Sequence, residues 1–122
     1  MNAYFPNSKW YNLFDGEMVN NYESNYVQLE APLELINAHI RGGYIIPFQF
    51  PSMTTAASRK NPFGLYVALG QGSNVTYTSA TGNLYWDDGE SLDSVETSSF
   101  NLFEFSAIED NIVSPKIHLI IM

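Results

Sequence analysis

Two adjacent carboxylates, Asp87 and Asp88, follow two aromatic residues, Tyr85 and Trp86, in the stretch GNLYWDDGES (residues 82–91). A glycosidase needs two carboxyl groups about 5 to 9.5 Å apart that face each other across a bound sugar. Neighbouring residues point to opposite faces of a strand and splay outward in a turn. Because an Asp-Gly step is typical of a hairpin turn, we interpret both acids as turn residues that accept backbone N–H groups, and we predict no catalytic residue in this chain.

Metal chemistry has little support in the sequence. The stretch DDGESLD offers four hard oxygen ligands: Asp87, Asp88, Glu90 and Asp93. It lacks the alternating acids and flanking helices of an EF-hand, so calcium would be a peripheral structural ion at most. The two histidines, His39 and His118, fall short of the three or more ligands that converge in a transition-metal site, and we interpret His39 as a structural strand residue. We therefore predict no metal and no cofactor.

Two binding hypotheses remain beside the turn interpretation. Tyr85 and Trp86 are candidates for a sugar contact by stacking and hydrogen bonding, which requires Trp86 to be exposed, although its alternation with Leu84 predicts burial. Asn74 begins the single Asn-Val-Thr sequon and is the candidate N-glycosylation site if the parent chain enters the secretory pathway. The glycines of Arg41-Gly42-Gly43 are expected to allow a close backbone approach, with Arg41 paired to a carboxylate.

Strands must position these residues, because short runs rich in aromatic and β-branched residues recur between Gly, Pro, Asn, Asp and Ser. The spacing near ten residues predicts an all-β fold, an antiparallel β-sandwich with very little helix. The predicted strands are Trp10–Phe14, Tyr26–Glu30, Ile36–Ile40, Tyr44–Phe50, Phe63–Leu69, Asn83–Asp87, Phe100–Ala107 and Lys116–Met122. Residues 52–60 have room for a helical turn. Residues 70–82, rich in Gly, Ser and Thr, are predicted to be a long loop or a domain boundary.

Length and charge exclude several classes of function. The 122 residues cannot contain a (β/α)₈ barrel of roughly 250 residues. Thirteen acidic residues against five basic ones give a net charge of −8, which would repel a phosphate backbone, so we predict no nucleic-acid partner. No apolar run approaches the roughly 18 residues of a membrane span, and we predict no membrane contact by this segment. The chain begins and ends as though cut from a longer one, which we take as an expectation.

Four longer motifs are more specific than any single residue pair. They are YFPNSKWYNLFDGE (Tyr4–Glu17), LEAPLELINAHIRGGYIIPFQ (Leu29–Gln49), SRKNPFGLYVAL (Ser58–Leu69) and GNLYWDDGESLDS (Gly82–Ser94). In this order and spacing, the chain resembles the C-terminal region of glycoside hydrolase family 31 α-glucosidases of the maltase-glucoamylase, sucrase-isomaltase and lysosomal acid α-glucosidase type. The resemblance extends from Tyr4 to about Ala107.

The resemblance implies that the catalytic aspartates lie on a (β/α)₈ barrel N-terminal to this region. The chain is then a non-catalytic accessory region of a retaining α-glucosidase that releases terminal α-linked glucose, with that barrel as its partner. Residues 1–71 would form the proximal C-terminal β-sandwich, and residues 72–122 a boundary loop and the truncated start of the distal β-domain. A parent of this type implies the secretory pathway, with an extracellular or lysosomal location.

Several alternatives stay open at this stage. Candidates for the barrel-facing side are Trp10, Tyr11, Phe14 and the Tyr44–Phe50 stripe, since a docked face buries apolar surface. Residues 72–122 either add strands to the first sandwich or leave Ile117–Met122 as an unpaired edge that favours self-association. Functions of other classes are a carbohydrate-binding module and a self-associating structural domain.

Overall fold

The computed structural model describes residues 1–21, 23–71, 77–109 and 118–121, and it confirms the predicted all-β class. The strands are β1 (Asn2–Phe5), β2 (Lys9–Asn12), β3 (Met18–Asn21), β4 (Asn25–Gln28), β5 (His39–Arg41), β6 (Tyr44–Gln49), β7 (Phe63–Ala68), β8 (Gly70–Gln71), β9 (Thr78–Trp86), β10 (Asn101–Glu109) and β11 (His118–Ile121). The short helix α1 (Thr55–Ser58) lies within the predicted helical segment and begins at the N-cap Thr54.

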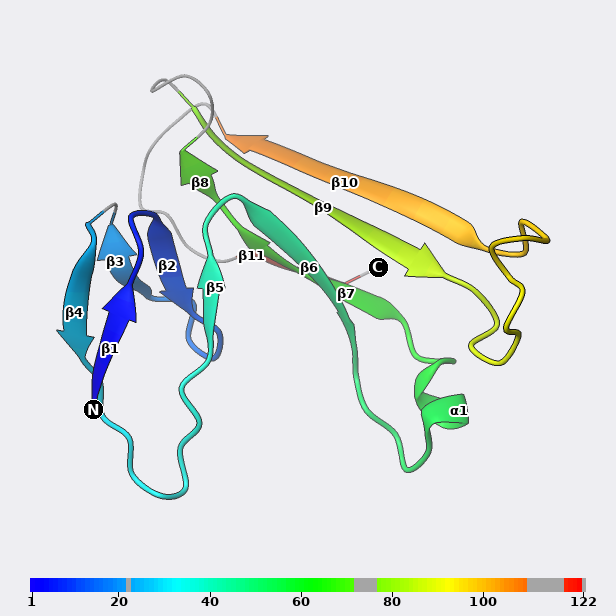
Figure 1. Cartoon of the computed structure of the whole chain (residues 1–122), viewed down its shortest axis with the longest axis horizontal. Helices are drawn as coiled ribbons and strands as arrows, with labels where there is room; N and C mark the ends of the chain where they lie inside the picture. The colour runs from blue at the N-terminus through cyan, green and yellow to red at the C-terminus, as the bar shows by residue number, and fades with distance from the viewer. Residues whose placement is uncertain (22, 72–76, 110–117, 122) are drawn as a thin grey trace.

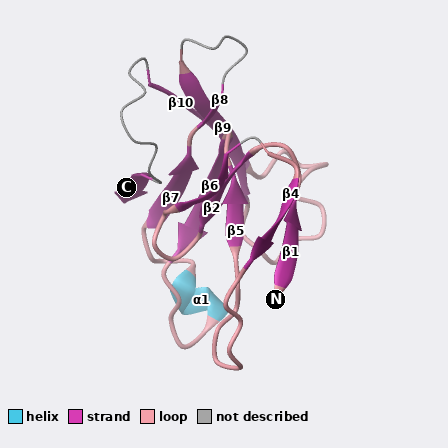
Figure 2. Ribbon diagram, turned by 90° about the vertical axis from the view of Figure 1, so that its left-hand side faces the viewer, coloured by secondary structure: helices cyan, strands magenta, loops and turns pink. Residues whose placement is uncertain are grey.

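The described strands form three sheets (Figure 1). Two small sheets, β1-β4 and β3-β2-β5, lie side by side at the N-terminal end of the molecule. The large sheet has the order β10-β9-β6-β7-β11, with β8 paired to β9. Its long β9–β10 hairpin extends away from the small sheets, and α1 lies beyond the ends of β6 and β7 (Figure 2).

The main core lies on one face of the large sheet. Alternation places Leu65, Val67 and Leu69 on one face of the segment 63–69, and each of them is at most 5% exposed. Ile45 from β6 and Ala80 from β9 complete this cluster, and rings and methyl groups from β10 pack against it. The pairs β6–β7 and β9–β10 thus place their apolar side chains in one common core, as the two layers of a sandwich do.

A second core joins the small sheets to the large one. Tyr11 of β2 is fully buried against Ile40 and Ala68, and its hydroxyl donates to the carbonyl oxygen of Leu69 at 2.7 Å. The expectation that Tyr11 faces the barrel is therefore wrong, because the ring fills the chain's own interior. Ile45, within the expected barrel-facing stripe Tyr44–Phe50, is buried for the same reason.

The crossing of β6 and β9 corrects the interpretation of residues 70–82. Tyr44 pairs with Thr81 in parallel, and a Cβ on Gly82 would lie 2.1 Å from the carbonyl oxygen of Ile45. Glycine at this position lets two backbones touch. Residues 70–71 and 78–82 are therefore strand rather than loop, and residues 72–76, with the Asn74 sequon, lie outside the described residues. The division of the chain at residue 72 stays a prediction.

The C-terminal strand occupies one of the two predicted placements. His118–Ile121 pairs antiparallel with β7, with Ile120 opposite Leu65. In its described part, this strand therefore adds to the large sheet as its outermost strand, paired on one side with β7. The remaining residues of the predicted strand lie outside the described ranges.

Candidate functional site

The acidic pair lies at the start of the loop 87–100 that connects β9 to β10. Asp87 Oδ1 accepts the N–H of Gly89 at 2.8 Å, and Asp88 Oδ1 accepts the N–H groups of Glu90 and Ser91 at 3.0 and 2.9 Å. These bonds match the expected turn role. The strands do form a hairpin, but the connection is far longer than the two-residue Asp-Gly turn that the sequence suggested.

A buried serine links the loop to the strand before it. Ser94 is 6% exposed, and its hydroxyl donates to Asp87 Oδ2 at 2.9 Å. The hydroxyl of Tyr85 lies 3.0 Å from Ser94 Oγ and is the donor of that pair, because the serine proton is already donated to Asp87. The Tyr85 ring stacks on Phe100 with centroids 4.9 Å apart. Both ends of the loop are thus fixed to one another.

These hydrogen bonds keep both carboxylates ionised. The Ser94 hydroxyl and the Gly89 N–H lower the pKa of Asp87 below its ordinary value. The Ser91 hydroxyl and N–H lower the pKa of Asp88 to about 2. A general acid at neutral pH needs a raised pKa, so neither group has the protonation behaviour of an acid catalyst.

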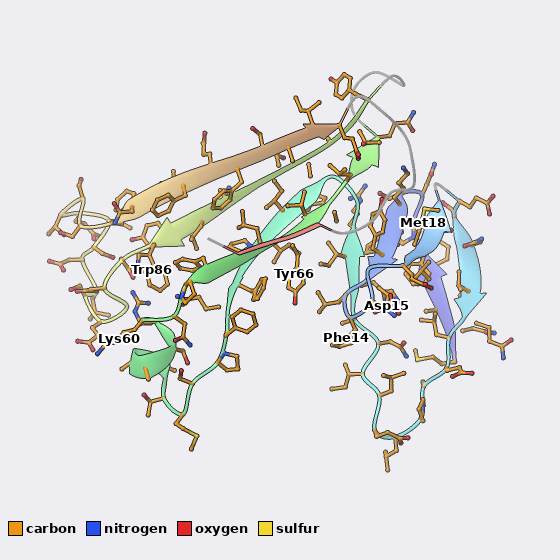
Figure 3. The ribbon with its side chains drawn as sticks, turned by 180° about the vertical axis from the view of Figure 1, so that it is seen from behind. Phe14, Asp15, Met18, Lys60, Tyr66 and Trp86 are labelled. Atoms are coloured by element: carbon orange, nitrogen blue, oxygen red, sulfur yellow. The ribbon has the colours of Figure 1, made fainter. Side chains whose placement is uncertain are left out.

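Arg59 holds this loop against the segment that follows α1. Its Nη2 donates to the carbonyl oxygen of Asp87, and its guanidinium lies 3.9 Å above the centroid of the Trp86 ring. Phe63 contacts the same indole edge-to-face, with centroids 4.9 Å apart. Trp86 is therefore half-buried between β9 and β7 (Figure 3), with one ring face covered by a cation. Sequence reasoning missed Arg59, because nothing local indicates a contact across 28 residues.

Other predicted residues have structural partners. His39 lies edge-to-face against Phe5 with centroids 5.0 Å apart; burial lowers its pKa, and Asp15 partly opposes this by raising it. Arg41 donates from Nε to the hydroxyl of Ser8 at 3.1 Å, instead of to the expected carboxylate. Within the described ranges, no group of three His, Cys, Asp or Glu residues is arranged to hold a metal ion.

The glycines after Arg41 have the predicted close approach. A Cβ on Gly42 would lie 2.9 Å from the Cβ of Lys9, and Gly43 has φ +95°, a conformation that favours glycine. The Gly43 N–H donates to the carbonyl oxygen of Ala68 at 2.7 Å. This turn therefore leads the chain from the small sheet into the large one.

An aromatic face covers the other side of β6 and β7. Phe48 stacks on Tyr66 with centroids 4.4 Å apart, and Phe50 contacts Phe48 edge-to-face at 5.4 Å. Ile46 shares this face by alternation and is 43% exposed. Tyr66 points away from the β9–β10 hairpin, in the direction of the loop that carries Phe14 (Figure 3). We call Phe48, Phe50, Tyr66 and Ile46 the aromatic face.

The fold and this loop define an all-β module with a hydrogen-bonded acidic loop and a partly exposed aromatic sheet face. Residues 1–46 match the model of the glycosyl hydrolase family 31 C-terminal domain. The chain is 39% identical over 134 aligned residues to lysosomal alpha-glucosidase of Rattus norvegicus, covering 96% of this chain and 14% of that protein. It is 42% identical over 106 residues to intestinal sucrase-isomaltase of Homo sapiens, covering 87% of this chain and 6% of that protein.

The structural comparison agrees with the sequence matches. The fold superposes on a crystal structure of glucosidase II alpha subunit with a TM-score of 0.75 and 29% identity, covering 87% of this chain and 11% of that one. The chain belongs to glycoside hydrolase family 31, where it matches the C-terminal region. It spans a small part of each of these relatives. No helix in the described part is long and apolar enough to cross a membrane.

Proposed function

We propose that this chain is a non-catalytic accessory region of a retaining α-glucosidase, and that its partner is the catalytic (β/α)₈ barrel of the parent chain. The aromatic face carries the proposal. Ile46 and Phe50 are 43% and 47% exposed on a sheet whose opposite side is already a packed core. A partly exposed apolar face of this kind is typical of an interface, and its burial contributes about 25 cal/mol per Å².

The acidic loop supports the non-catalytic part of the proposal. Asp87 and Asp88 hold the loop through backbone N–H groups and two serine hydroxyls, and both have lowered pKa values. A retaining glycosidase needs one carboxyl group with a raised pKa opposite a nucleophilic carboxylate. The chemistry, release of terminal α-linked glucose, is then done by the barrel.

The relatives also suggest a compartment. Their names include a lysosomal alpha-glucosidase and an intestinal sucrase-isomaltase, which favours a parent in the secretory pathway, either lysosomal or extracellular. In that setting Asn74 is the proposed glycosylation site. The division into residues 1–71 and 72–122 is likewise part of the proposal.

A paired substitution in the parent enzyme tests the docking role. Ile46→Asp places a charge on the aromatic face, whereas Ile36→Asp places the same charge on a residue that is 79% exposed outside the large sheet. We expect Ile46→Asp to lower the melting temperature of the whole enzyme, with Ile36→Asp close to the wild type. Equal melting temperatures for the two variants would contradict docking through this face.

The isolated chain tests the absence of catalysis. We expect the purified 122-residue chain to release no glucose from maltose. Glucose release that disappears in Asp87→Asn or Asp88→Asn would overturn the proposal and return the pair to an active site. Sedimentation of the same sample over a range of concentrations tests the self-association alternative, which requires a mass that rises with concentration.

The structure affects the sugar-contact hypothesis differently for Tyr85 and for Trp86. Tyr85 is 42% exposed, which favours a role in binding. Trp86 has one ring face under the Arg59 guanidinium, which leaves it less able to stack on a ligand. Titration of the chain with maltose, followed through the Trp86 indole N–H signal and the Tyr85 ring signals, tests each residue separately.

A further inference from the structure

A polar hollow of about 760 Å³ lies where β6 crosses β9. This volume falls in the range of about 300–1,000 Å³ that is usual for small-molecule sites. The side chains that line it and reach solvent are Tyr44, Thr81, Asn83, Glu104 and Ser106. A second hollow of about 350 Å³ shares Tyr44 and Thr81 and continues to Arg41 and Asn7. We call the two together the Tyr44 groove.

The strand register places the polar side chains on one face. Asn83 is paired with Glu104, Thr81 with Ser106, and Tyr44 with Thr81. Directly paired residues lie on the same side of a sheet. The pair Asn83–Glu104 and the pair Thr81–Ser106 are therefore about 7 Å apart along the strands. Within the described part of the chain, none of the four polar side chains of β9 and β10 makes a hydrogen bond. Their donors and acceptors are therefore free for a ligand.

Aromatic rings flank this polar grid. Tyr44 is 50% exposed at one end, with the Arg41 guanidinium 6.0 Å from its ring centroid. Ser8 accepts from Arg41 Nε and so fixes the guanidinium at the border of the second hollow. Tyr85 lies two residues beyond Asn83 on the same side of β9, whereas Trp86 lies on the opposite side.

The chemistry of the groove selects its ligand class. One carboxylate and one guanidinium leave the lining close to neutral, and the net charge of −8 disfavours an anionic ligand. Hydroxyl, amide and carboxylate groups between exposed rings match a molecule with many hydroxyls and apolar C–H faces. We propose that the Tyr44 groove binds a neutral oligosaccharide of pyranose units.

Within the groove, the residues divide the work by chemical type. The amide of Asn83 and the carboxylate of Glu104 form a donor and acceptor pair for neighbouring sugar hydroxyls. The Thr81 and Ser106 hydroxyls serve the next unit, and the Tyr44 ring stacks on its C–H face. The choice of α-linked glucose as the sugar rests on the proposed function, while the groove itself does not.

Titration of the ¹⁵N-labelled 122-residue chain with maltotriose and with cellotriose tests this site. We expect the amide signals of Thr81, Asn83 and Glu104 to move with maltotriose, and the Trp86 indole signal to stay in place. Asn83→Ala and Tyr44→Ala should each raise the Kd roughly tenfold, the effect of one lost hydrogen bond or stacked ring.

Tyr26→Ala is the matched control, since Tyr26 is 73% exposed on β4, outside the large sheet. It should leave the Kd unchanged. If Tyr44→Ala alters the amide spectrum as a whole, Asn83→Ala and Ser106→Ala carry the test, because both side chains are exposed and unbonded.

Each outcome bears on a separate part of the inference. Unmoved signals with both sugars, or an equal loss of affinity in Tyr26→Ala, would overturn the groove. Binding of cellotriose without maltotriose would support the groove and overturn its assignment to α-linked glucose. The docking test at Ile46 measures the melting temperature of the parent enzyme, whereas this titration uses the 122-residue chain alone, so a failure of the docking test leaves this result intact.

Discussion

Replacement of Tyr11 by Phe removes a single oxygen from the contact between the small and large sheets. The Tyr11 ring is fully buried, and its hydroxyl donates at 2.7 Å to the carbonyl oxygen of Leu69, itself a 3% exposed residue. Tyr11→Phe keeps the packing against Ile40 and Ala68 but leaves that carbonyl without this donor. The change therefore measures the hydrogen bond and not the ring.

The expected cost is that of a buried acceptor that loses its partner, about 1–3 kcal/mol. For a chain of this length, the melting temperature should fall by about 3 to 6 °C for each kcal/mol. Tyr11→Ala should cost more, about 3–5 kcal/mol, because it also opens a cavity between the sheets.

Urea unfolding followed by tyrosine and tryptophan fluorescence is the assay. We expect a lower midpoint with an unchanged m-value, since the exposed surface on unfolding is the same. The matched control is Tyr26→Phe, which removes a hydroxyl from a side chain that is 73% exposed and should change stability by less than about 0.5 kcal/mol. Equal midpoints for Tyr11→Phe and Tyr26→Phe would refute the reasoning.

Three further predictions concern the large sheet and its loop. Arg59→Lys should cost about 1–2 kcal/mol and shift the Trp86 fluorescence maximum, because an ammonium cannot reproduce a planar stacked guanidinium; an unchanged spectrum would argue against the stack. Gly64→Ala should cost about 1–3 kcal/mol in thermal unfolding, since its Cβ would lie 2.4 Å from the Phe48 ring, and combining it with Phe48→Leu should recover part of that loss. The pKa of Asp88 is about 2 in the folded chain and has its ordinary value in the unfolded chain. The unfolded state therefore binds more protons between about pH 4 and 2. The stability that this carboxylate contributes at neutral pH is lost as the pH falls through that window. Asp88→Asn should flatten the acid limb of a plot of urea midpoint against pH, and an unchanged limb would contradict the assignment.

The sequence was most informative where one face of a strand is apolar. Alternation in the segment 63–69 predicts one buried face, and Leu65, Val67 and Leu69 do enter one core. Ala68 on the opposite face is buried as well, in the second core, which alternation did not predict. It failed for β3, whose residues Met18–Asn21 carry little apolar pattern and pair with β2 alone. It also failed for the first half of β9, where Ala80 and Gly82 are small because the packed face lies close to another strand.

The candidate site shows the same limit in its side chains. The turn role of Asp87 and Asp88 follows from the local Asp-Gly chemistry, so the sequence predicted it. No local pattern encodes which strands meet. The contact of Arg59 with Trp86 and the hydrogen bond of Tyr11 to the Leu69 carbonyl both depend on it, so the sequence did not predict them. The groove beside Tyr44 is a property of the register between three strands and was likewise not predictable.

The close backbone contact between Gly82 and Ile45 fixes the orientation of the whole β9–β10 hairpin, which we call the arm. Any side chain larger than hydrogen at residue 82 would separate β6 from β9 and change the direction in which the β9–β10 hairpin leaves the sheet. Variation in such a module is then free to lengthen or reshape the arm's distal tip, where loop 87–100 lies, while the angle at which the arm leaves the body stays constant. The Tyr44 groove lies beside this backbone contact and therefore keeps its shape even when the loop 87–100 changes.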